Sequence, residues 1–252
     1  MNTSISVETC RRGVTTLRLQ RPDRGNAFNQ TMLNEVYAAL TDLAADPSVR
    51  SLVLRGDGKH FCTGADMSSR GDSDSGVSLS DTLHLLDIFP KPVMGVIHGG
   101  CVGGGLAIAA CCDVVLADTQ AFFAVPEVRL GLAPSVALTG YFLRAMGPRA
   151  FRRYGLSGER IGSAEALRLG IAHEVTESGA IDTRLEQLID DFLHCAPLAL
   201  AEFKGRIALL TTSAPHSNAN DGPRGLERSP EAAEGVAAFK EKRKPVWYPS
   251  FN

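Results

Sequence analysis

The stretch Ile97-His-Gly-Gly-Cys-Val-Gly-Gly-Gly-Leu-Ala-Ile-Ala-Ala-Cys-Cys-Asp113 decides how this chain of 252 residues is interpreted. An apolar, strand-like run ends in glycines, and a helix-like run of small residues follows. Glycine lets a backbone N–H group approach a ligand closely, so such a turn can hold a phosphate or a developing oxyanion. Taken alone, the glycines favour tight packing of helix on strand. The spacing matches neither G-x-G-x-x-G nor G-x-x-x-x-G-K-[ST], which argues against a nucleotide phosphate.

Two flanking stretches add possible chemistry to the glycine run. Phe61-Cys-Thr-Gly-Ala-Asp66 follows an apolar strand, and a free N–H group can point outward there, although an ordinary turn explains it too. Phe122-Phe-Ala-Val-Pro-Glu-Val-Arg-Leu-Gly131 places Glu127 in an apolar run. Burial there would raise the pKa of Glu127 toward the range of a general acid or base. The alternative is a salt bridge from Glu127 to Arg129 or another arginine.

Hydrophobic periodicity predicts an α/β fold. Residues 14–19, 52–54, 93–97 and 114–117 are short, mainly apolar runs typical of strands. Between the first two, apolar residues recur at helical spacing from Gln30 to just before Pro47. Strands that alternate with helices favour a sheet with crossover connections.

The second half of the chain is predicted to be helical from Ser163, which we expect to cap a helix that ends before Gly170. Apolar stripes predict further helices at residues 185–193 and 200–210. A last helix starts at Pro230 after the cap Ser229, with Val236 and Phe239 facing inward. The breaker-rich stretches 68–80 and 211–228 are predicted to be loops.

Composition excludes several classes of partner. The net charge of −2 lacks the basic excess that nucleic acid or a membrane surface would require. The apolar runs are too short to cross a membrane, and the first residues lack a secretory pattern. The six cysteines form no regular framework, which suits reduced thiols, so we expect a cytoplasmic protein. His98 and Cys101 have a zinc-like gap but no second pair, so we expect no metal. Of the remaining histidines, only His60 and His84 lie near the predicted site loops.

Together the three stretches resemble the crotonase superfamily of enoyl-CoA hydratases and isomerases. Three more motifs extend the resemblance over nearly the whole chain: Arg21-Pro-Asp-Arg-Gly-Asn-Ala-Phe28, Leu156-Ser-Gly-Glu-Arg-Ile-Gly-Ser-Ala-Glu-Ala-Leu-Arg-Leu-Gly-Ile171 and Ser229-Pro-Glu-Ala-Ala-Glu-Gly-Val-Ala-Ala-Phe-Lys-Glu-Lys-Arg-Lys-Pro-Val-Trp247. The resemblance implies a crotonase-type spiral of ββα repeats over residues 1–190, which holds the CoA and active site. It also implies a C-terminal helical trimerisation region over residues 191–252, and a homotrimer or a homohexamer.

Carried over position by position, the resemblance implies an oxyanion hole formed by the N–H groups of Ala65 and Gly104, with Glu127 as the catalytic acid and base. It implies a substrate-binding set of Arg24, which would contact the CoA phosphates, with Ala27, Gly64, Asp66, Met67 and Gly105. The basic tail (Lys240, Lys242, Arg243 and Lys244) could hold the 3′-phosphate or could be a solvated helix end. No tightly bound cofactor is implied, because coenzyme A arrives as part of the acyl-CoA substrate.

The resemblance departs from the two-glutamate hydratases at one position. The first of their glutamates falls on Ala107, whereas the second falls on Glu127. The surrounding residues resemble the bacterial methylglutaconyl-CoA hydratases, which carry a small residue at that place. The sequence therefore predicts a hydratase or dehydratase of that type, acting in fatty-acid or branched-chain metabolism. The alternatives are a Δ3,Δ2-enoyl-CoA isomerase or a decarboxylase on the same scaffold and, from another class, a non-catalytic scaffold or an RNA-binding relative. The near-neutral charge opposes RNA binding, and the retained Glu127 opposes a silent scaffold.

Overall fold

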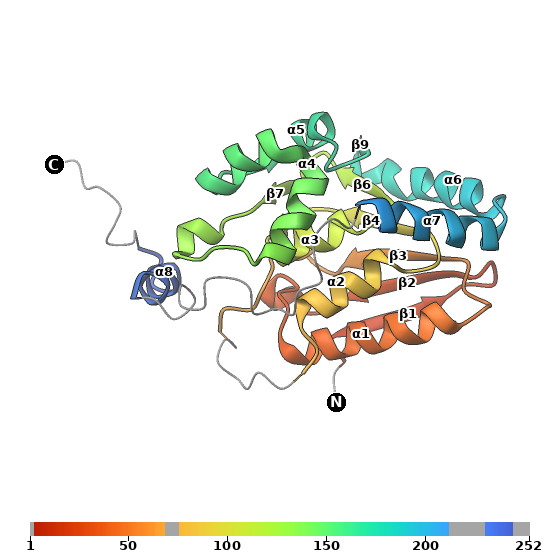
Figure 1. The fold of residues 1–252 in the computed structure, drawn as a ribbon, viewed down its shortest axis with the longest axis horizontal. Coiled ribbons are helices and arrows are strands. Elements are labelled where there is room, and N and C mark those ends of the chain that lie inside the picture. Colours follow the sequence, from red (N-terminus) through yellow and green to blue (C-terminus); the bar gives the residue numbers. More distant parts are fainter. Residues whose placement is uncertain (1–2, 69–75, 212–229, 244–252) are drawn as a thin grey trace.

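The computed structural model of the chain describes residues 3–68, 76–211 and 230–243, and a six-stranded sheet forms its centre (Figure 1). In spatial order its strands are β1 (Ile5–Thr9), β2 (Val14–Leu19), β3 (Ser51–Gly56), β4 (Val93–Ile97), β6 (Val114–Asp118) and β9 (Glu174–Thr176). Strand β1 runs antiparallel to β2, and every other neighbouring pair is parallel. The four strands predicted from the sequence are all present in this sheet.

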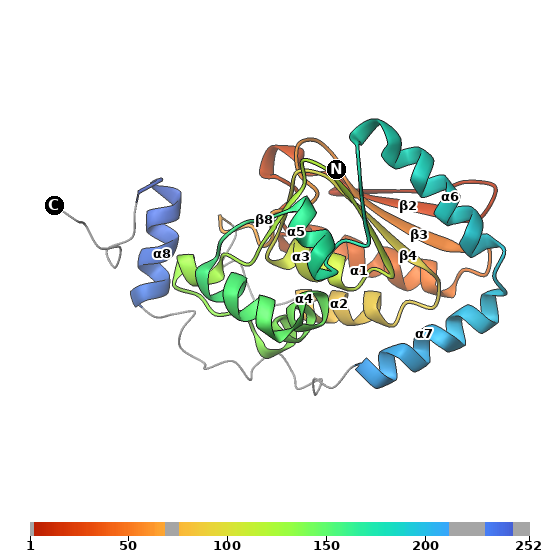
Figure 2. The ribbon, with the colours of Figure 1, turned by 90° about the horizontal axis from the view of Figure 1, so that it is seen from above.

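Helices cover both faces of the sheet, as Figure 2 shows. One face packs against α1 (Gln30–Ala45), α2 (Leu79–Asp87) and α3 (Gly104–Ala110). The other face packs against α6 (Ile181–Leu193), whose Leu185 and Ile189 contact apolar side chains of the central strands. Burial on both faces explains why β3 and β4 have continuous apolar sequences. The predicted domain boundary at 190/191 falls inside α6.

A second, three-stranded sheet completes the repeat pattern. It contains β5 (Gly100–Val102), β7 (Phe122–Ala124) and β8 (Ile161–Gly162). Each of these strands follows a turn and precedes helical structure: α3, then the 3-10 turn η2 (Glu127–Leu130) with α4 (Val136–Ser157), then α5 (Ser163–Leu169). The repeated strand–strand–helix units that the resemblance implies are therefore present, and the α/β prediction is confirmed.

Two helices were not predicted from the sequence. Helix α2 begins inside the stretch predicted to be a loop, where Ser78 accepts from the backbone of Asp81 and the Asp81 carboxylate accepts from Ser78. This capping box was a readable signal among the breaker residues. Helix α4 is interrupted by Gly147, whose φ of 73° is not helical, and by Pro148. The interruption breaks the apolar period, so the sequence does not reveal this helix of 22 residues.

Details of the C-terminal half correct the sequence prediction. Ser163 is the first residue of α5 rather than its cap, and its hydroxyl donates to the carbonyl of Thr119 at 2.8 Å. Helix α7 (Pro197–Thr211) and helix α8 (Pro230–Lys240) are present. Phe239 of α8 does not face inward but is 61% exposed, because Gly235 and Ala238 form the buried face. The cap Ser229 and nearly all of the loop 211–228 lie outside the described residues.

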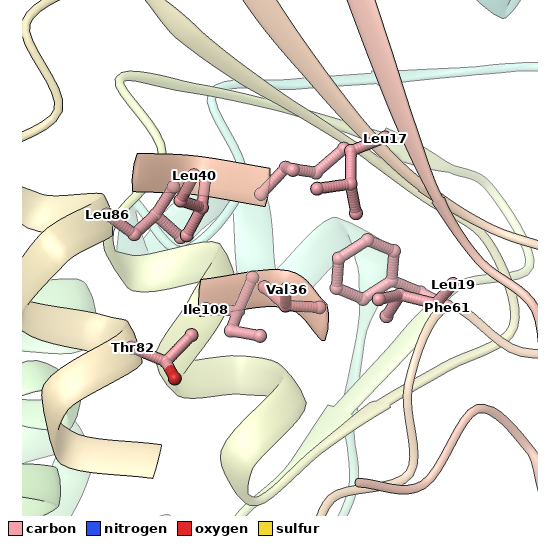
Figure 3. Close-up of a pocket in the computed structure, with 9 residues that line it drawn as sticks. Leu17, Leu19, Val36, Leu40, Phe61, Thr82, Leu86 and Ile108 are labelled. Atoms are coloured by element: carbon pink, nitrogen blue, oxygen red, sulfur yellow. The ribbon is translucent and has the colours of Figure 1, made fainter. Parts of the chain in front are cut away.

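A small apolar cavity lies between α1, α2, α3 and the sheet (Figure 3). Its lining includes Leu17, Val36 and Ile108, which belong to the core. The cavity has no polar surface and is a packing gap rather than a ligand site. None of the helices in the described ranges has the length and apolarity needed to cross a bilayer. All six cysteines are free thiols.

Helices α7 and α8 lie at opposite ends of the molecule (Figures 1 and 2). Helix α7 is attached to the sheet through Lys204, whose ammonium lies 2.6 Å from the Asp113 carboxylate and 2.9 Å from the Lys91 carbonyl. The same carboxylate accepts the backbone N–H of Val93 at 2.7 Å. One charged side chain therefore links α7 to the starts of β4 and β6.

We expect Lys204→Met to lower the free energy of unfolding by about 1–3 kcal/mol, because it leaves the half-buried Asp113 carboxylate without its cation. The matched control is Arg206→Met on the same helix, since Arg206 and its partner Glu202 are both exposed and contribute little. Urea denaturation of the two variants measures the difference. Equal losses would show that the Lys204 contacts do not hold α7.

Candidate functional site

Three short segments lie side by side and end at the same place. Residues 61–65 pair with residues 100–104 through the Cys62 N–H to the Gly100 carbonyl at 3.1 Å and the Val102 N–H to the Cys62 carbonyl at 2.9 Å. Strand β5 pairs in turn with β7, and the Gly103 N–H donates to the Ala124 carbonyl at 2.9 Å. Because all three run parallel, the sequence that follows each one is delivered to the same edge.

Glycines line the point where the segments end. Gly64 has a φ of 90°, and a Cβ added there would lie 3.0 Å from the Val102 carbonyl oxygen and 3.5 Å from the Gly104 nitrogen. Gly103 has a φ of 52°, and its added Cβ would lie 2.9 Å from Oε1 of Glu127. Both conformations and both spaces therefore require glycine. The space kept open lies between Gly64, Gly104 and the Glu127 carboxylate.

Two backbone donors at this point are left unused. The residues around Ala65 pair with Phe28, whose N–H donates to the Gly64 carbonyl at 2.7 Å and whose carbonyl accepts the Asp66 N–H at 2.8 Å. Gly104 begins α3, so its N–H has no acceptor within the helix. In the part of the chain that the structure describes, neither the Ala65 nor the Gly104 N–H donates to another group. Two such donors can stabilise a developing negative charge on oxygen.

The Glu127 carboxylate lies beside these donors in a poorly solvated place. Glu127 follows β7 at the start of η2, and its Oε2 is buried without a hydrogen-bond partner among the described residues. Burial raises its pKa to about 7, against a small opposing effect of its own backbone N–H. The alternative prediction, a salt bridge from Glu127 to Arg129, is wrong, because the Arg129 guanidinium donates instead to the Ser157 carbonyl at 2.9 Å. A carboxyl group with such a pKa can both take and return a proton at neutral pH.

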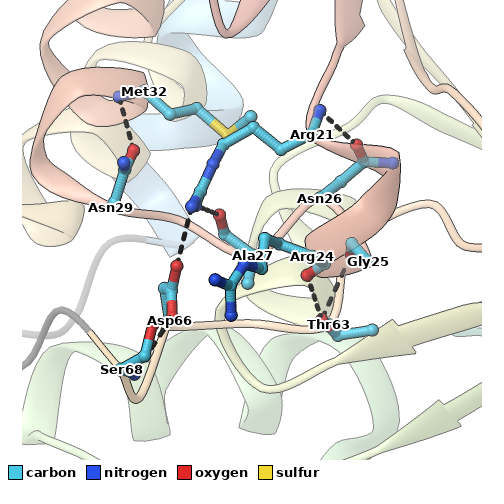
Figure 4. Close-up of polar contacts among 10 residues, drawn as sticks. All are labelled: Arg21, Arg24, Gly25, Asn26, Ala27, Asn29, Met32, Thr63, Asp66 and Ser68. Atoms are coloured by element: carbon cyan, nitrogen blue, oxygen red, sulfur yellow. Dashed lines mark hydrogen bonds and ion pairs between the residues drawn. The ribbon is translucent and has the colours of Figure 1, made fainter.

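The loop before α1 is held against the site by an arginine that the sequence analysis did not select (Figure 4). Arg21 donates to the Ala27 carbonyl and, at 2.8 Å, to the Asp66 carboxylate. Burial opposes ionisation of Asp66, but the hydrogen bonds from Ser68 and Arg21 outweigh it and lower its pKa to about 2. Two predicted substrate-binding residues, Ala27 and Asp66, thus form a rigid frame around Ala65.

The other predicted site residues are less central. Gly105 packs against Cys62, since an added Cβ would lie 2.5 Å from the Cys62 carbonyl oxygen. Arg24 is exposed at the end of the 3-10 turn η1 (Pro22–Arg24), and Met67 is half-buried in the loop after Ala65. The Thr63 hydroxyl donates to the Gly25 carbonyl at 3.1 Å, which places η1 at the rim of the site.

Two further predictions from the sequence concern the basic residues of the C-terminal tail and the absence of a metal site. Arg243 pairs with Glu234 and Glu241 of its own segment, as a solvated helix end would, and Lys244 lies outside the described residues. Within residues 3–68, 76–211 and 230–243, no three His, Cys, Asp or Glu side chains are grouped so as to hold a metal ion.

Besides Arg21, two further features of the site were missed in the sequence. Gly103 separates Glu127 from Gly64, and its signal was its place within the glycine run. Leu79 of α2 covers Gly104, because an added Cβ on that glycine would lie 2.9 Å from Cδ2 of Leu79. Leu79 could be found only after the capping box of α2 had been recognised.

Comparison with known proteins gives consistent results along the whole chain. The sequence profile described as enoyl-CoA hydratase/isomerase matches residues 9–249. The chain is 32% identical over 249 residues to a probable enoyl-CoA hydratase of Bacillus subtilis, covering 92% of this chain and 94% of that protein. It is 30% identical over 236 residues to the 2,3-dehydroadipyl-CoA hydratase of Escherichia coli, covering 91% and 92%.

The fold has a close counterpart among solved structures. An enoyl-CoA hydratase from Mycobacterium avium subsp. paratuberculosis superimposes with a TM-score of 0.87 at 27% identity, covering 98% of this chain and 99% of that one. The similarity extends over the sheet, the flanking helices and the C-terminal helices together.

The raised pKa of Glu127 predicts a pH-dependent cost to stability. The folded chain keeps this proton up to about pH 7, whereas the ordinary value is 4.5, so stability is lost as the pH rises between these values. Glu127→Gln cannot ionise. We therefore expect the free energy of unfolding of this variant, relative to that of the native chain, to rise by about 2–3 kcal/mol from about pH 5 to about pH 8. Urea denaturation at both pH values measures the gain, with exposed Glu202→Gln as control. A difference that does not change with pH would contradict the burial of the Glu127 carboxylate.

Proposed function

Because the chain belongs to the enoyl-CoA hydratase/isomerase family, we propose that it binds acyl-CoA thioesters and stabilises their enolates with the N–H groups of Ala65 and Gly104. The chain is an enzyme of this family. The observation that carries the finer proposal is the buried Glu127 carboxylate, which faces a space kept open by glycines and flanked by the two unused donors. The thioester oxygen would accept both N–H groups, and the bond-making carbons would lie toward Glu127.

In the proposed hydration, Glu127 takes a proton from water as the water oxygen bonds to the β-carbon. The electrons of the double bond move onto the thioester oxygen, where the two N–H groups hold the enolate. Glu127 then returns the proton to the α-carbon, and the carbonyl re-forms. A carboxyl group with a pKa of about 7 suits both steps, because neither protonation state is strongly favoured at neutral pH. Dehydration is the same sequence in reverse.

Ala107 limits what the site can do. Its side chain is 0% exposed and belongs to the core, and its N–H donates to the Gly103 carbonyl at 3.1 Å. The position therefore supplies no second carboxylate. Of the reactions considered, we propose first a hydratase or dehydratase of methylglutaconyl-CoA type. The small residue at 107 supports this assignment, as do the two curated relatives named as hydratases.

The same observation favours a second candidate. One carboxylate is sufficient to move a proton from one carbon to another, as a Δ3,Δ2-enoyl-CoA isomerase does. A decarboxylase needs only the oxyanion hole, because loss of CO₂ generates the enolate directly. Neither reaction requires a second group to hold water, so Ala107 is compatible with both.

Coenzyme A would arrive over the rim that η1 forms. Arg24 is exposed there, and we propose that it contacts the phosphates as a charge-assisted donor. Ala27, Gly64, Asp66, Met67 and Gly105 would form the floor beneath the pantetheine and thioester. Of these, Asp66 and Gly105 act through the loops that they hold, because Asp66 is already paired with Arg21 and Gly105 packs on Cys62.

One experiment separates the candidate reactions. The enzyme is incubated in D₂O with 2-enoyl, 3-enoyl and glutaconyl thioesters, and the products are identified by mass spectrometry. A gain of D₂O indicates hydration, deuterium exchange with a shifted double bond indicates isomerisation, and loss of CO₂ indicates decarboxylation. No change in any thioester would contradict the proposed function.

We expect Glu127→Gln to lower kcat on the active thioester by about 10²–10⁴, the usual effect of removing a proton-transfer group. Acyl-CoA binding should persist, because the two backbone donors are unchanged. Glu202→Gln on α7 is the control and should retain full activity. Full activity of Glu127→Gln would assign the proton transfer to another residue, with His84 and Asp66 tested next.

We also propose that copies of the chain associate as a trimer, or as a dimer of trimers. Leu198, Leu209 and Leu210 of α7 are 80–87% exposed, and such apolar side chains are usually covered by a partner. Light scattering after size-exclusion chromatography should give three or six times the 26.9 kDa mass of one chain. Leu209→Glu combined with Leu210→Glu should lower that mass. A native chain that elutes only as a monomer would rule out the assembly.

A further inference from the structure

The pairing of the first two site segments has an irregular end at His60. In a parallel ladder that contains the two bonds at Cys62, the next bond would run from the Gly100 N–H to the His60 carbonyl. That carbonyl is instead occupied by the amide of buried Asn26, which donates to it at 2.7 Å. The Gly100 N–H donates to Nδ1 of the His60 ring at 2.9 Å. The side chain therefore replaces its own backbone carbonyl as the acceptor of the ladder.

This replacement fixes the protonation state of the ring. A backbone N–H can only donate, so Nδ1 of His60 must carry a lone pair and the ring must be neutral. An imidazolium would place a second proton against the Gly100 N–H and break the contact. His98 differs, because its Nε2 lies 2.9 Å from the Gly58 carbonyl and can donate to it in either charge state.

The surroundings of His60 keep it neutral. Burial lowers its pKa, and the nearby positive charges of Lys59, His98 and Arg160 lower it further. Arg160 lies over the Phe122 ring at 4.2 Å, and the same ring meets His60 edge-on with 6.2 Å between centroids. The one carboxylate of this loop, that of Asp57, interacts with Gln20 and Arg18.

The contact lies where it can set the geometry of the donors. Gly100 begins β5, which leads directly to Gly104, and His60 begins the segment that leads to Ala65. A Cβ added to Gly99 would lie 2.0 Å from the Lys59 carbonyl oxygen and 3.0 Å from Nδ1 of His60. The two segments are therefore in direct contact where they begin. Losing the Gly100 bond would free the start of the ladder, and the two segments that carry the N–H groups at its other end could then shift relative to each other.

We propose that His60 is a positioning residue that, only as the neutral imidazole, holds the Ala65 and Gly104 segments in the register that recognises a thioester carbonyl. This inference rests on the proposed function, because it assumes that these two N–H groups bind the substrate oxygen. It predicts that carbonyl recognition weakens as the pH falls below the ordinary histidine value of 6.5, even when Glu127 cannot titrate.

The test uses the full chain carrying Glu127→Gln, so that no turnover or Glu127 ionisation interferes. Affinities for butyryl-CoA and for coenzyme A are measured by isothermal titration calorimetry between about pH 8 and about pH 5.5. Both ligands carry the same phosphates, but only the thioester has the carbonyl. The ratio of the two affinities therefore reports the butyryl group, and its change with pH reports the carbonyl contact, because the apolar chain does not titrate. We expect this ratio to fall several-fold toward the acid end of the range, short of the roughly tenfold loss that removing one hydrogen bond would give, because the lowered pKa of His60 leaves part of the ring neutral there.

Matched variants identify the titrating group. In His60→Asn the Oδ1 atom can occupy the place of Nδ1 and accept the Gly100 N–H without titrating, so the ratio should stay high at every pH. In His60→Leu the acceptor is absent, so the ratio should be low at every pH. His98→Gln keeps a donor toward Gly58 and should follow the parent protein.

The outcomes separate this inference from the proposed function. A ratio that stays high at every pH in the parent protein would overturn the role of His60 and leave the oxyanion hole intact. A His60→Asn protein that loses affinity like its parent would overturn the role as well. A ratio near one at every pH would mean that the carbonyl is not recognised at all, and it would overturn the proposed function together with the inference.

Discussion

The parallel pairing of three short segments is the constraint on which the site depends. Residues 61–65, 100–104 and 122–127 are joined by backbone hydrogen bonds, so none can move along its axis without breaking bonds to a neighbour. The two candidate donors are backbone groups, and their positions follow from this register rather than from any rotamer. The sheet and its two helical layers supply the rigidity, because the segments continue directly from the buried strands β3, β4 and β6. The positions of the Ala65 and Gly104 N–H groups therefore depend on the packing of the whole fold and not on a few local side chains.

Keeping that place open has a cost in stability. Gly64 and Gly103 adopt positive φ values in which a side chain would be strained, and glycine loses more conformational freedom on folding than any other residue. Oε2 of Glu127 is buried beside them without a partner among the described residues, and burial disfavours the charged form of the carboxylate. The frame around the site offsets part of this cost. Arg21 joins the loop before α1 to Asp66, and Asn26 uses its buried amide on the Asp57 and His60 carbonyls at 2.8 and 2.7 Å.

The sequence predicted those strands and helices that an uninterrupted apolar period or apolar run identifies. Strands β2, β3, β4 and β6 and helices α1, α6 and α7 were found because an apolar period or run identifies each of them. Helix α4 was missed because Gly147 and Pro148 interrupt its period, and α2 was missed because its capping box lies among loop-forming residues. At the site, resemblance selected Gly64, Ala65, Gly104 and Glu127, which the fold brings together. It did not select Arg21, and it gave no role to His60, which the sequence singled out only for its nearness to the site loops, because both roles arise from long-range contacts that leave no local pattern.

The burial of Ala107 bears on which carboxylates are available at the site and on what sets the pKa of Glu127. Every residue of α3 from Gly104 to Ala109 is buried, and Gly105 is pressed against Cys62, so the helix has no room to rotate. A glutamate at 107 would bring a second carboxylate into the core, where burial disfavours its charged form. With alanine there, the pKa of Glu127 is set by burial, without a competing charge from α3. In the proposed hydration, the water molecule would then be held by the substrate or by backbone groups. With no carboxylate on α3, the proposed mechanism assigns both the donation and the acceptance of the proton to Glu127, and a pKa of about 7, which burial provides, suits that double role.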